Sequence, residues 1–306
     1  MAKRILILSF PDDYHAQAIA AMLGKQGHEA DVVDTSTFPV SSSLTYRAGR
    51  ESDAWLDGRA LSDYHSVWWR RVRTPAVAPE VKIPEERRFA ASESREALWG
   101  AIQASGLPIY NSPAAEYVAD RKPYQLRMAQ AAGLRVPDTL ITTSQEEVRE
   151  FRRLHGEIIY KSFGPNDLAV MDTRPLTDAD EADLWRLRLA PAIFQEYVPR
   201  GREYRVTLVE DDVFAAEIEI SRPDAAYDWR NDLAYQAKPA KLPEEVEDGL
   251  RRLRRRLGLS SGSADLRETP DGTIYFLEMN PSGQFLFLDI RAGLDIGPRF
   301  CEMLLQ

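Results

Sequence analysis

The sequence predicts an α/β protein that opens with a β-α-β unit and continues into lobes that mix helices with hairpins. Residues 3–9, KRILILS, form an apolar run, and residues 29–35, EADVVDT, predict a second strand. Between them, residues 12–27 have the spacing of an amphipathic helix that ends near Gly27. This order is typical of a parallel sheet. A chain of 306 residues also exceeds what one core usually covers, so two or three lobes are expected.

The remaining elements follow from local patterns. HSVWWRRV at 65–72 predicts a strand in which Trp68 and Trp69 serve core packing. Two helices are expected to meet at DRKP, because proline is tolerated in a first helical turn. Further helices are expected at 85–105 and 243–258, and further strands at 158–163 and 192–198. Hairpins are expected at 203–221 and 263–283.

The predicted domains are 1–110, an N-terminal lobe; 111–194, a central lobe; and 195–306, a C-terminal lobe. The loop after the first strand, SFPDDYH, lacks the G-x-G-x-x-G pattern, so a dinucleotide-binding fold is not supported.

Composition limits the function classes. The net charge of −9 argues against nonspecific nucleic-acid binding. The basic run at 251–257 follows acids in a helical pattern, which favours a solvated helix face over a nucleic-acid patch. No apolar run reaches the roughly 18 residues of a membrane span. Cys301 is the single cysteine, so no internal disulfide or thiolate metal site is expected, and a reducing cytoplasm is the simplest location.

Three oxygen-bearing side chains lie in the last predicted hairpin. The turn at Pro270–Gly272 folds Asp265 back beside the strand that carries Glu278 and Asn280. Glu278 and Asn280 are two residues apart, so both point to one face of that strand. Such a set suits Mg²⁺, which takes few protein oxygens and completes its shell with water and phosphate. The alternative, outward polar residues of an edge strand, is common for the pair alone.

Other charged residues favour a functional site over ordinary outward residues of an edge strand. Lys161 lies inside an apolar strand, where an unpaired ammonium would be costly, and a phosphate partner would explain it. Lys122 lies at the helix junction. Glu203 and Arg205 are again two residues apart, after a strand and a short loop.

Taken in their order along the chain from Lys122 to Asn280, these motifs resemble those of the ATP-grasp ligases. The resemblance implies an ATP-grasp fold with an N-terminal β-α-β pre-ATP-grasp domain at 1–110. It assigns Lys122 and Lys161 to the ATP phosphates. The Glu196 carbonyl and the Val198 amide of FQEYV would bond the adenine edge, and Glu203 would bond the ribose hydroxyls.

The same resemblance assigns Arg205 to the transferring phosphoryl group. Asp265, Glu278 and Asn280 become its metal ligands. ATP and Mg²⁺ are therefore the expected cofactors. The segment KSFGPNDLAVMDT at 161–173 departs from many ATP-grasp enzymes, because it carries one glycine where a glycine-rich phosphate flap is usual.

A narrower resemblance covers nearly the whole chain. ILILSFPDDYHA, VWWRRV, DWR and NPSGQFLFLD are similar to segments of the graspetide synthetases, the microviridin-type maturases of ribosomal peptides. These enzymes join side-chain carboxylates of a precursor peptide to lysine amines or to serine or threonine hydroxyls. For the peptide carboxylate, Arg230 is the leading candidate clamp and Arg222 the second. Asp228 would orient that arginine or help take a proton from the nucleophile.

The implied partner is a ribosomal precursor peptide with a leader and a core. A homodimer is a candidate assembly, and the sequence does not give the oligomeric state. Two alternatives stay open. One is an ATP-grasp ligase of free amino acids or other small carboxylates and amines, similar to RimK or to D-Ala-D-Ala ligase. The other is a non-catalytic nucleotide-binding protein. The sequence does not distinguish ester from amide products.

Overall fold

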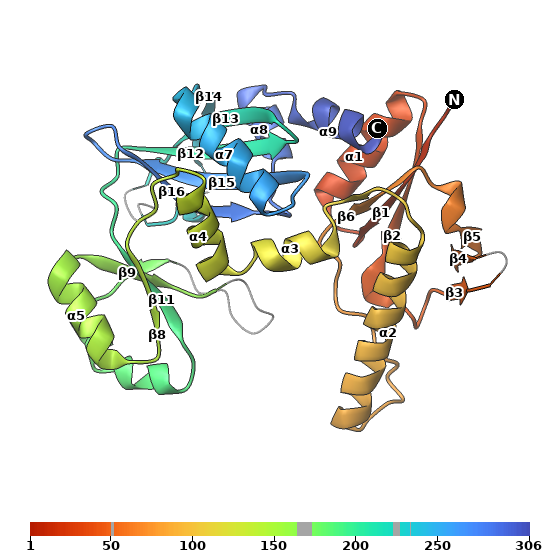
Figure 1. The fold of residues 1–306 in the computed structure, drawn as a ribbon, viewed down its shortest axis with the longest axis horizontal. Helices are drawn as coiled ribbons and strands as arrows, with labels where there is room; N and C mark the ends of the chain where they lie inside the picture. Colours follow the sequence, from red (N-terminus) through yellow and green to blue (C-terminus); the bar gives the residue numbers. More distant parts are fainter. Residues whose placement is uncertain (50–51, 164–172, 223–226, 233) are drawn as a thin grey trace. The chain divides into compact units, whose positions relative to one another are not determined.

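The structure is a computed structural model that describes residues 1–49, 52–163, 173–222, 227–232 and 234–306 (Figure 1). The chain divides into two compact units, each built from discontinuous segments. Unit 1 comprises Met1–Tyr117, Gly258–Ser261 and Asp295–Gln306, and unit 2 comprises Val118–Leu257 and Gly262–Leu294. No helix in the described part of the chain is long and apolar enough to cross a membrane.

Unit 1 contains the expected β-α-β opening. Its parallel sheet has the order β2-β1-β6-β7. The strands are β1 (Arg4–Ser9), β2 (Glu29–Asp34), β6 (Ser66–Trp69) and β7 (Ile109–Tyr110). The helices are α1 (Tyr14–Lys25), α2 (Pro84–Ala104) and α9 (Ile296–Leu304). The predicted parallel arrangement of the opening is therefore confirmed.

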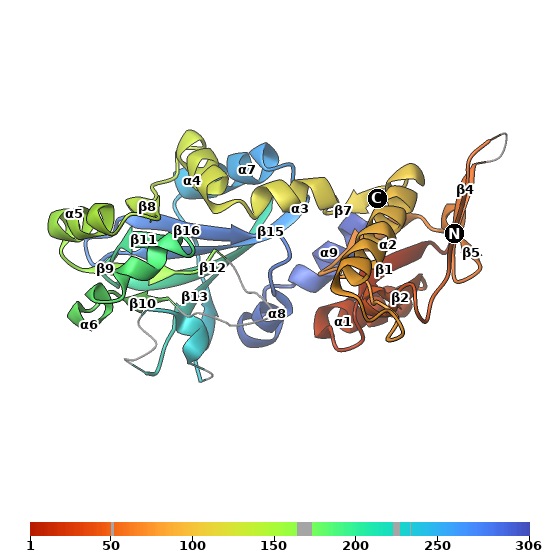
Figure 2. The same ribbon diagram turned by 90° about the horizontal axis from the view of Figure 1, so that it is seen from below.

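Alternation along β1 explains how both faces of this sheet become covered. Leu6 and Leu8 pack in one cluster with Leu98 and Ile102 of α2. The residues between them, Ile5 and Ile7, have the opposite direction in a strand and are also fully buried. Figures 1 and 2 show α2 on one side of the sheet, and α1 and α9 on the other. Buried apolar residues on both faces are typical of a parallel sheet.

Unit 1 also has a small antiparallel sheet that the sequence patterns did not predict. It comprises β3 (Leu44–Arg47), β4 (Asp53–Leu56) and β5 (Arg59–Ala60). β4 supplies two buried residues, Ala54 and Leu56, to the α2 cluster, whereas β3 is mostly exposed. A strand with so little burial shows no clear apolar alternation.

Unit 2 contains two antiparallel sheets. The smaller has the order β10-β9-β11-β8, and α5 (Gln145–His155) packs on it through Val148, which lies in one cluster with Ile158 and Phe194. Its strands are β8 (Thr139–Thr142), β9 (Ile158–Lys161), β10 (Arg174–Pro175) and β11 (Ala192–Glu196). A short helix, α6 (Asp178–Glu181), follows β10.

The larger sheet of unit 2 has the order β14-β13-β12-β15-β16. Both predicted hairpins are confirmed, as β12–β13 and β15–β16. The strands are β12 (Arg202–Val209), β13 (Asp212–Glu219), β14 (Gln236–Pro239), β15 (Ser261–Glu268) and β16 (Ile274–Asn280). The associated helices are α4 (Lys122–Ala131), α7 (Glu244–Arg256) and α8 (Leu286–Ala292). Helix α3 (Pro113–Ala119) belongs to unit 1 as far as Tyr117 and ends in unit 2. Figure 2 shows α4 and α7 on one face of this sheet.

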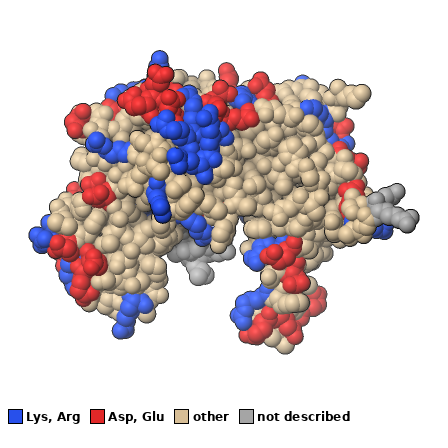
Figure 3. Space-filling view, viewed as in Figure 1, with Lys and Arg blue, Asp and Glu red and all other residues tan. Residues whose placement is uncertain are grey.

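The basic run of α7 pairs with nearby acids. Figure 3 shows basic side chains gathered over α7 next to acidic ones. Arg251 bonds Glu247 and Asp248 on the same helix, and Arg254 and Arg255 both bond Asp211. This surface is the paired helix face that the sequence indicated.

Candidate active site

The β15–β16 hairpin sets the centre of the candidate site. Asp265 and Glu278 are direct partners in the antiparallel register, and Asn280 is opposite Ser263. The ladder has a bulge between Asp265 and Leu266. A bulge changes the direction of nearby side chains and is frequent beside active sites. The structure therefore confirms that the hairpin places Asp265 beside Glu278, as the turn sequence predicts.

Four cations from different elements converge on these two carboxylates. Lys122, at the first position of α4, donates to Glu278 at 2.7 Å. Arg205 of β12 donates through Nη1 to both oxygens of Asp265 at 3.0 Å, and its Nη2 donates to the carbonyl of Gln284 at 3.1 Å. The nearest approach of Arg230 to Glu278 is 3.7 Å, between Nη1 and Oε1.

Lys161, the fourth cation, is held in the smaller sheet. Its ammonium donates to the side-chain oxygen of Gln195 at 3.2 Å, and Gln195 donates in turn to the Thr139 hydroxyl at 2.8 Å. Burial lowers the pKa of Lys161, although Glu278 opposes that shift. The hydrogen bond to Gln195 and the charge of Glu278 thus partly compensate for the burial of this ammonium. The sequence did not show either partner.

Glu278 is the common electrostatic partner. Burial alone would raise its pKa, but the charges of Lys122, Lys161 and Arg230 lower that pKa well below its ordinary range. The carboxylate therefore stays ionised at neutral pH. An ionised carboxylate opposite a second one is a suitable donor pair for a hard divalent cation.

Asn280 ends β16 and begins the turn. Its side-chain oxygen accepts from the backbone N–H of Ser282 at 3.1 Å, and its carbonyl accepts from the N–H of Gly283 at 3.3 Å. Gly283 lies against the site, since a Cβ placed there would be 2.8 Å from Nη2 of Arg205 and 2.6 Å from the Cβ of Ser263. The turn at 281–283 thus has a steric reason for its glycine.

The DWR segment is fixed beside the same group. Asp228 accepts two bonds from the Arg230 guanidinium, at 2.8 and 2.9 Å, and one from its backbone N–H. Trp229 packs against Tyr235 and Phe287, with ring centroids 5.0 and 5.9 Å apart. Burial opposes the charge of Arg230, but Asp228 and the site acids raise its pKa. Arg230 is thus held as a permanent cation next to Glu278.

A second group of charges lies around the start of β12. Glu203 is buried and pairs with Arg267 of β15, and it lies 3.6 Å from Nε of Arg200. Arg267 also donates to the carbonyl of Val198 at 3.3 Å. Burial raises the pKa of Glu203, and both arginines oppose that shift. Arg267 thus links the two residues that the sequence assigned to adenine and ribose contacts, and no motif had pointed to it.

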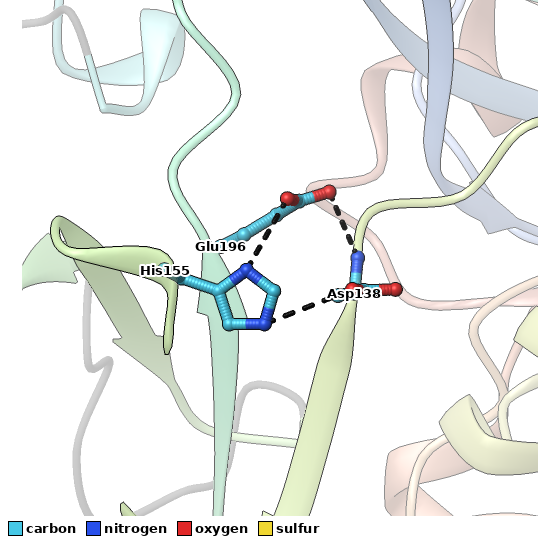
Figure 4. A group of neighbouring side chains, drawn as sticks. All are labelled: Asp138, His155 and Glu196. Carbon is cyan, nitrogen blue, oxygen red and sulfur yellow. Dashed lines mark hydrogen bonds and ion pairs between the residues drawn. The ribbon is translucent and has the colours of Figure 1, made fainter. Parts of the chain in front are cut away.

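Glu196 belongs to a polar group of its own. It accepts from the backbone N–H of Asp138 at 3.0 Å through one oxygen. Figure 4 shows His155 between the two acids, with Nδ1 3.6 Å from Glu196 and Nε2 3.7 Å from Asp138. Among the described residues, these three form the one group of three or more His, Cys, Asp or Glu side chains close enough to share a metal ion. Because a metal would bind a single ring nitrogen, this geometry suits an imidazole between two carboxylates better.

Two predicted features lie outside this convergence. Arg222 is exposed beyond the end of β13 and its backbone lies beside Asp232, so its role as second clamp stays a prediction. The glycine-poor phosphate segment falls largely on residues 164–172, which lie outside the described residues.

Three solved structures share this fold over almost the whole chain. The macrocyclase MdnC of Microcystis aeruginosa MRC, bound with precursor peptide MdnA, is 29% identical with a TM-score of 0.88, and 99% of both chains is covered. The ATP-grasp ligase PsnB, complexed with a minimal precursor, Mg and ADP, is 30% identical with a TM-score of 0.81, covering 98% of this chain and 96% of that chain.

The third is a RiPP-associated ATP-grasp ligase of Chryseobacterium gregarium, in complex with ADP and a leader and core peptide. It is 24% identical with a TM-score of 0.89, covers 99% of this chain and 96% of that chain, and supports the fold alone. No family model matches the sequence, and no curated protein matches it.

The fold that the chain shares with these ligases makes it an ATP-grasp ligase, which confirms the predicted fold class and enzyme class. Within that class the chain belongs to the graspetide-type ligases, the family of MdnC and PsnB, as the motifs predicted.

Proposed function

We propose that this protein activates side-chain carboxylates of a ribosomal precursor peptide with ATP and joins them to amines or hydroxyls of the same peptide. The products are macrolactam or macrolactone rings. Family membership supports the ligase chemistry, and the precursor peptides bound to MdnC and PsnB support the substrate class. The single observation that carries the proposal is the convergence of Lys122, Arg205 and Arg230 on the Asp265–Glu278 pair.

The chemistry explains why such a convergence is needed. A carboxylate does not react with an amine or hydroxyl at neutral pH, because oxide is a poor leaving group. Transfer of the γ-phosphoryl group of ATP to a carboxylate oxygen releases ADP and gives an acyl phosphate. Attack by the nucleophile then releases phosphate, which keeps that oxygen. Both steps develop negative charge on phosphoryl oxygens, and positioned cations stabilise it.

The residues present fit Mg²⁺. Asp265 and Glu278 supply facing carboxylates, and Asn280, two residues along β16, supplies an amide oxygen. When bound, the ion would neutralise charge on the nucleotide phosphates. Lys122 and Arg205 now pair with these carboxylates, so both would be released toward phosphate oxygens once the acids take a different cation.

Lys161, Glu203 and the end of β11 complete the proposed nucleotide site. Lys161 is near enough to Glu278 for each charge to shift the pKa of the other, and Lys122 also affects the pKa of Lys161, so the three groups belong to one charge cluster. Arg267 couples Glu203 to the Val198 carbonyl. We assign the adenine edge to the backbone of Glu196 and Val198, and the ribose hydroxyls to Glu203.

Arg230 is the proposed clamp for the peptide carboxylate. Both carboxylate oxygens of Asp228 accept hydrogen bonds from the Arg230 guanidinium. This supports an orienting role for Asp228 over a role in proton transfer. Nη1 of Arg230 approaches the acid pair, so a carboxylate bound there would lie beside the proposed phosphoryl donor.

The proposal places the enzyme in a reducing cytoplasm, where a single buried cysteine, Cys301, poses no redox problem. We retain leader recognition and a homodimer as predictions.

The test is incubation of the protein with ATP, Mg²⁺ and synthetic precursor peptides encoded beside its gene. We expect ADP release and a peptide that loses the mass of one water for each ring. If the protein ligates free amino acids and leaves the precursor peptides unmodified, the proposed macrocyclase activity is contradicted. Absence of ADP release with every acceptor would favour a nucleotide-binding protein.

A further inference from the structure

We propose that Gln125 is a positioning residue of this site. Its buried carboxamide holds helix α4 and strand β16 in the register at which Lys122 and Glu278 meet. The proposal rests on the proposed nucleotide site, because the residues that it positions are the phosphate and metal residues assigned above.

Gln125 uses its whole side-chain amide on the backbone. It is fully buried, at 0% exposure. Its Nε2 donates to the carbonyl of Met279 at 2.6 Å and to the carbonyl of Ala119 at 2.7 Å, and its Oε1 accepts from the N–H of Met279 at 2.9 Å. Both donors and the acceptor are therefore satisfied.

The position of β16 explains why it needs such a partner. β16 is the outer strand of its sheet and has β15 on one side only. The outward N–H and C=O of Met279 would lack a ladder partner, and Gln125 supplies a donor and an acceptor in place of another strand. A carboxamide can do both at once, whereas a carboxylate would place a second acceptor against two carbonyl oxygens.

Helix α4 and strand β16 are thus joined by two adjacent contacts. Met279 lies between Glu278 and Asn280, so fixing its peptide group fixes the direction of both side chains. Gln125 lies one turn after Lys122 on α4, and the Lys122–Glu278 and Gln125–Met279 contacts join the same two elements. The bond to Ala119 extends this hold to the end of α3, just before α4 begins.

A purely structural role would affect stability without changing the dependence on Mg²⁺. Partners of metal ligands typically change metal affinity about 10- to 100-fold when they are removed. Since Gln125 acts through the backbone beside Glu278, we expect the lower end of that range.

The experiment is calorimetric titration of ADP into the full chain at a series of Mg²⁺ concentrations, with melting temperatures measured in parallel. For Gln125→Met, the Mg²⁺ concentration that gives half-maximal ADP binding should rise about tenfold. Gln125→Asn keeps a carboxamide but shortens the side chain by one methylene, so it is the second variant if the first does not fold. The control Leu253→Ala creates a cavity under α7, and it should lower the melting temperature without the Mg²⁺ effect.

The outcomes separate the two claims. Failure of the wild-type protein to bind ADP with Mg²⁺ would overturn the nucleotide site and this role with it. Binding by the wild type, together with an unchanged Mg²⁺ dependence in the folded Gln125 variants, would overturn the role of Gln125 alone.

Discussion

The two units each contain buried ion pairs, and the pairs differ in their access to solvent. In unit 1, Asp13 and Arg70 are 4% and 2% exposed, and Asp13 also accepts from Ser9 and from the N–H of His15. In unit 2, Lys122 and Glu278 are 17% and 21% exposed. The first pair is sealed, whereas the second remains reachable by another ion. For these two pairs, access to solvent separates a pair that supports the fold from one that can exchange partners.

The largest expected effect on stability comes from opening the sealed pair. Asp13→Ala removes the carboxylate to which the buried Nε of Arg70 donates, and it removes the N-cap of α1. Breaking a buried pair typically costs about 3–5 kcal/mol. Urea unfolding should show this loss. An unchanged free energy of unfolding would remove the distinction between the two pairs.

The same pair gives a pH test. Burial opposes ionisation of Asp13, but Arg70, Ser9 and the His15 N–H lower its pKa. A lowered pKa stabilises the folded state above the unfolded value of about 3.9, and this contribution is lost as the pH falls through the folded value. The difference in stability between the wild type and Asp13→Ala should therefore narrow in acid. A difference that grows with acidity would contradict the assignment.

Glu278→Gln tests the reachable pair. Removing the charge on which three cations converge should lower turnover by a factor of about 100 to 1,000, the usual loss for one positioned electrostatic contact. Single-turnover ADP release measures it. Glu217→Gln is the matched control, since Glu217 pairs with Lys238 on the same sheet, and it should keep activity. Equal activity of both variants would remove Glu278 from the site.

Gly283→Ala should have a smaller effect. The new Cβ would lie 2.8 Å from Nη2 of Arg205 and 2.6 Å from the Cβ of Ser263, so one of them must move. Overpacking of this kind costs about 1–3 kcal/mol. We expect kcat to fall more than the melting temperature suggests, because Arg205 is displaced from Asp265. A wild-type kcat would show that the position of Arg205 is not critical.

The smallest effect should come from a fully exposed pair. Arg153 bonds Glu150 on the surface of α5, where water and salt screen the charges. Arg153→Ala should leave both turnover and stability unchanged within error. A clear loss in either measurement would show that exposure is a poor guide to the importance of a pair in this protein.

The sequence predicts those contacts of the site that neighbouring residues determine, and it does not predict the contacts between distant segments. Asp265 and Glu278 meet because Pro270–Gly272 makes the turn and the arms alternate, and both are visible in the sequence. Gln125 and Met279 are 154 residues apart, and nothing near either residue indicates their contact. The Arg267–Glu203 pair likewise depends on the order of β12 and β15 in the sheet.

The fold shows the same division between local and long-range information. The β-α-β opening and both hairpins follow from neighbouring residues. The return of Asp295–Gln306 to unit 1 depends on packing, with Trp68 and Phe300 in contact at a centroid distance of 4.7 Å. The division into three domains at 1–110, 111–194 and 195–306 remains a prediction.

Activation of a peptide carboxylate as an acyl phosphate is the core of the proposed function, and an isotope label can detect it. The side-chain carboxylates of the precursor peptide would be labelled with heavy oxygen before reaction with ATP and Mg²⁺. We expect that the phosphate released with each ring carries one labelled oxygen, measured by mass spectrometry. Ring formation with unlabelled phosphate would show that no acyl phosphate forms.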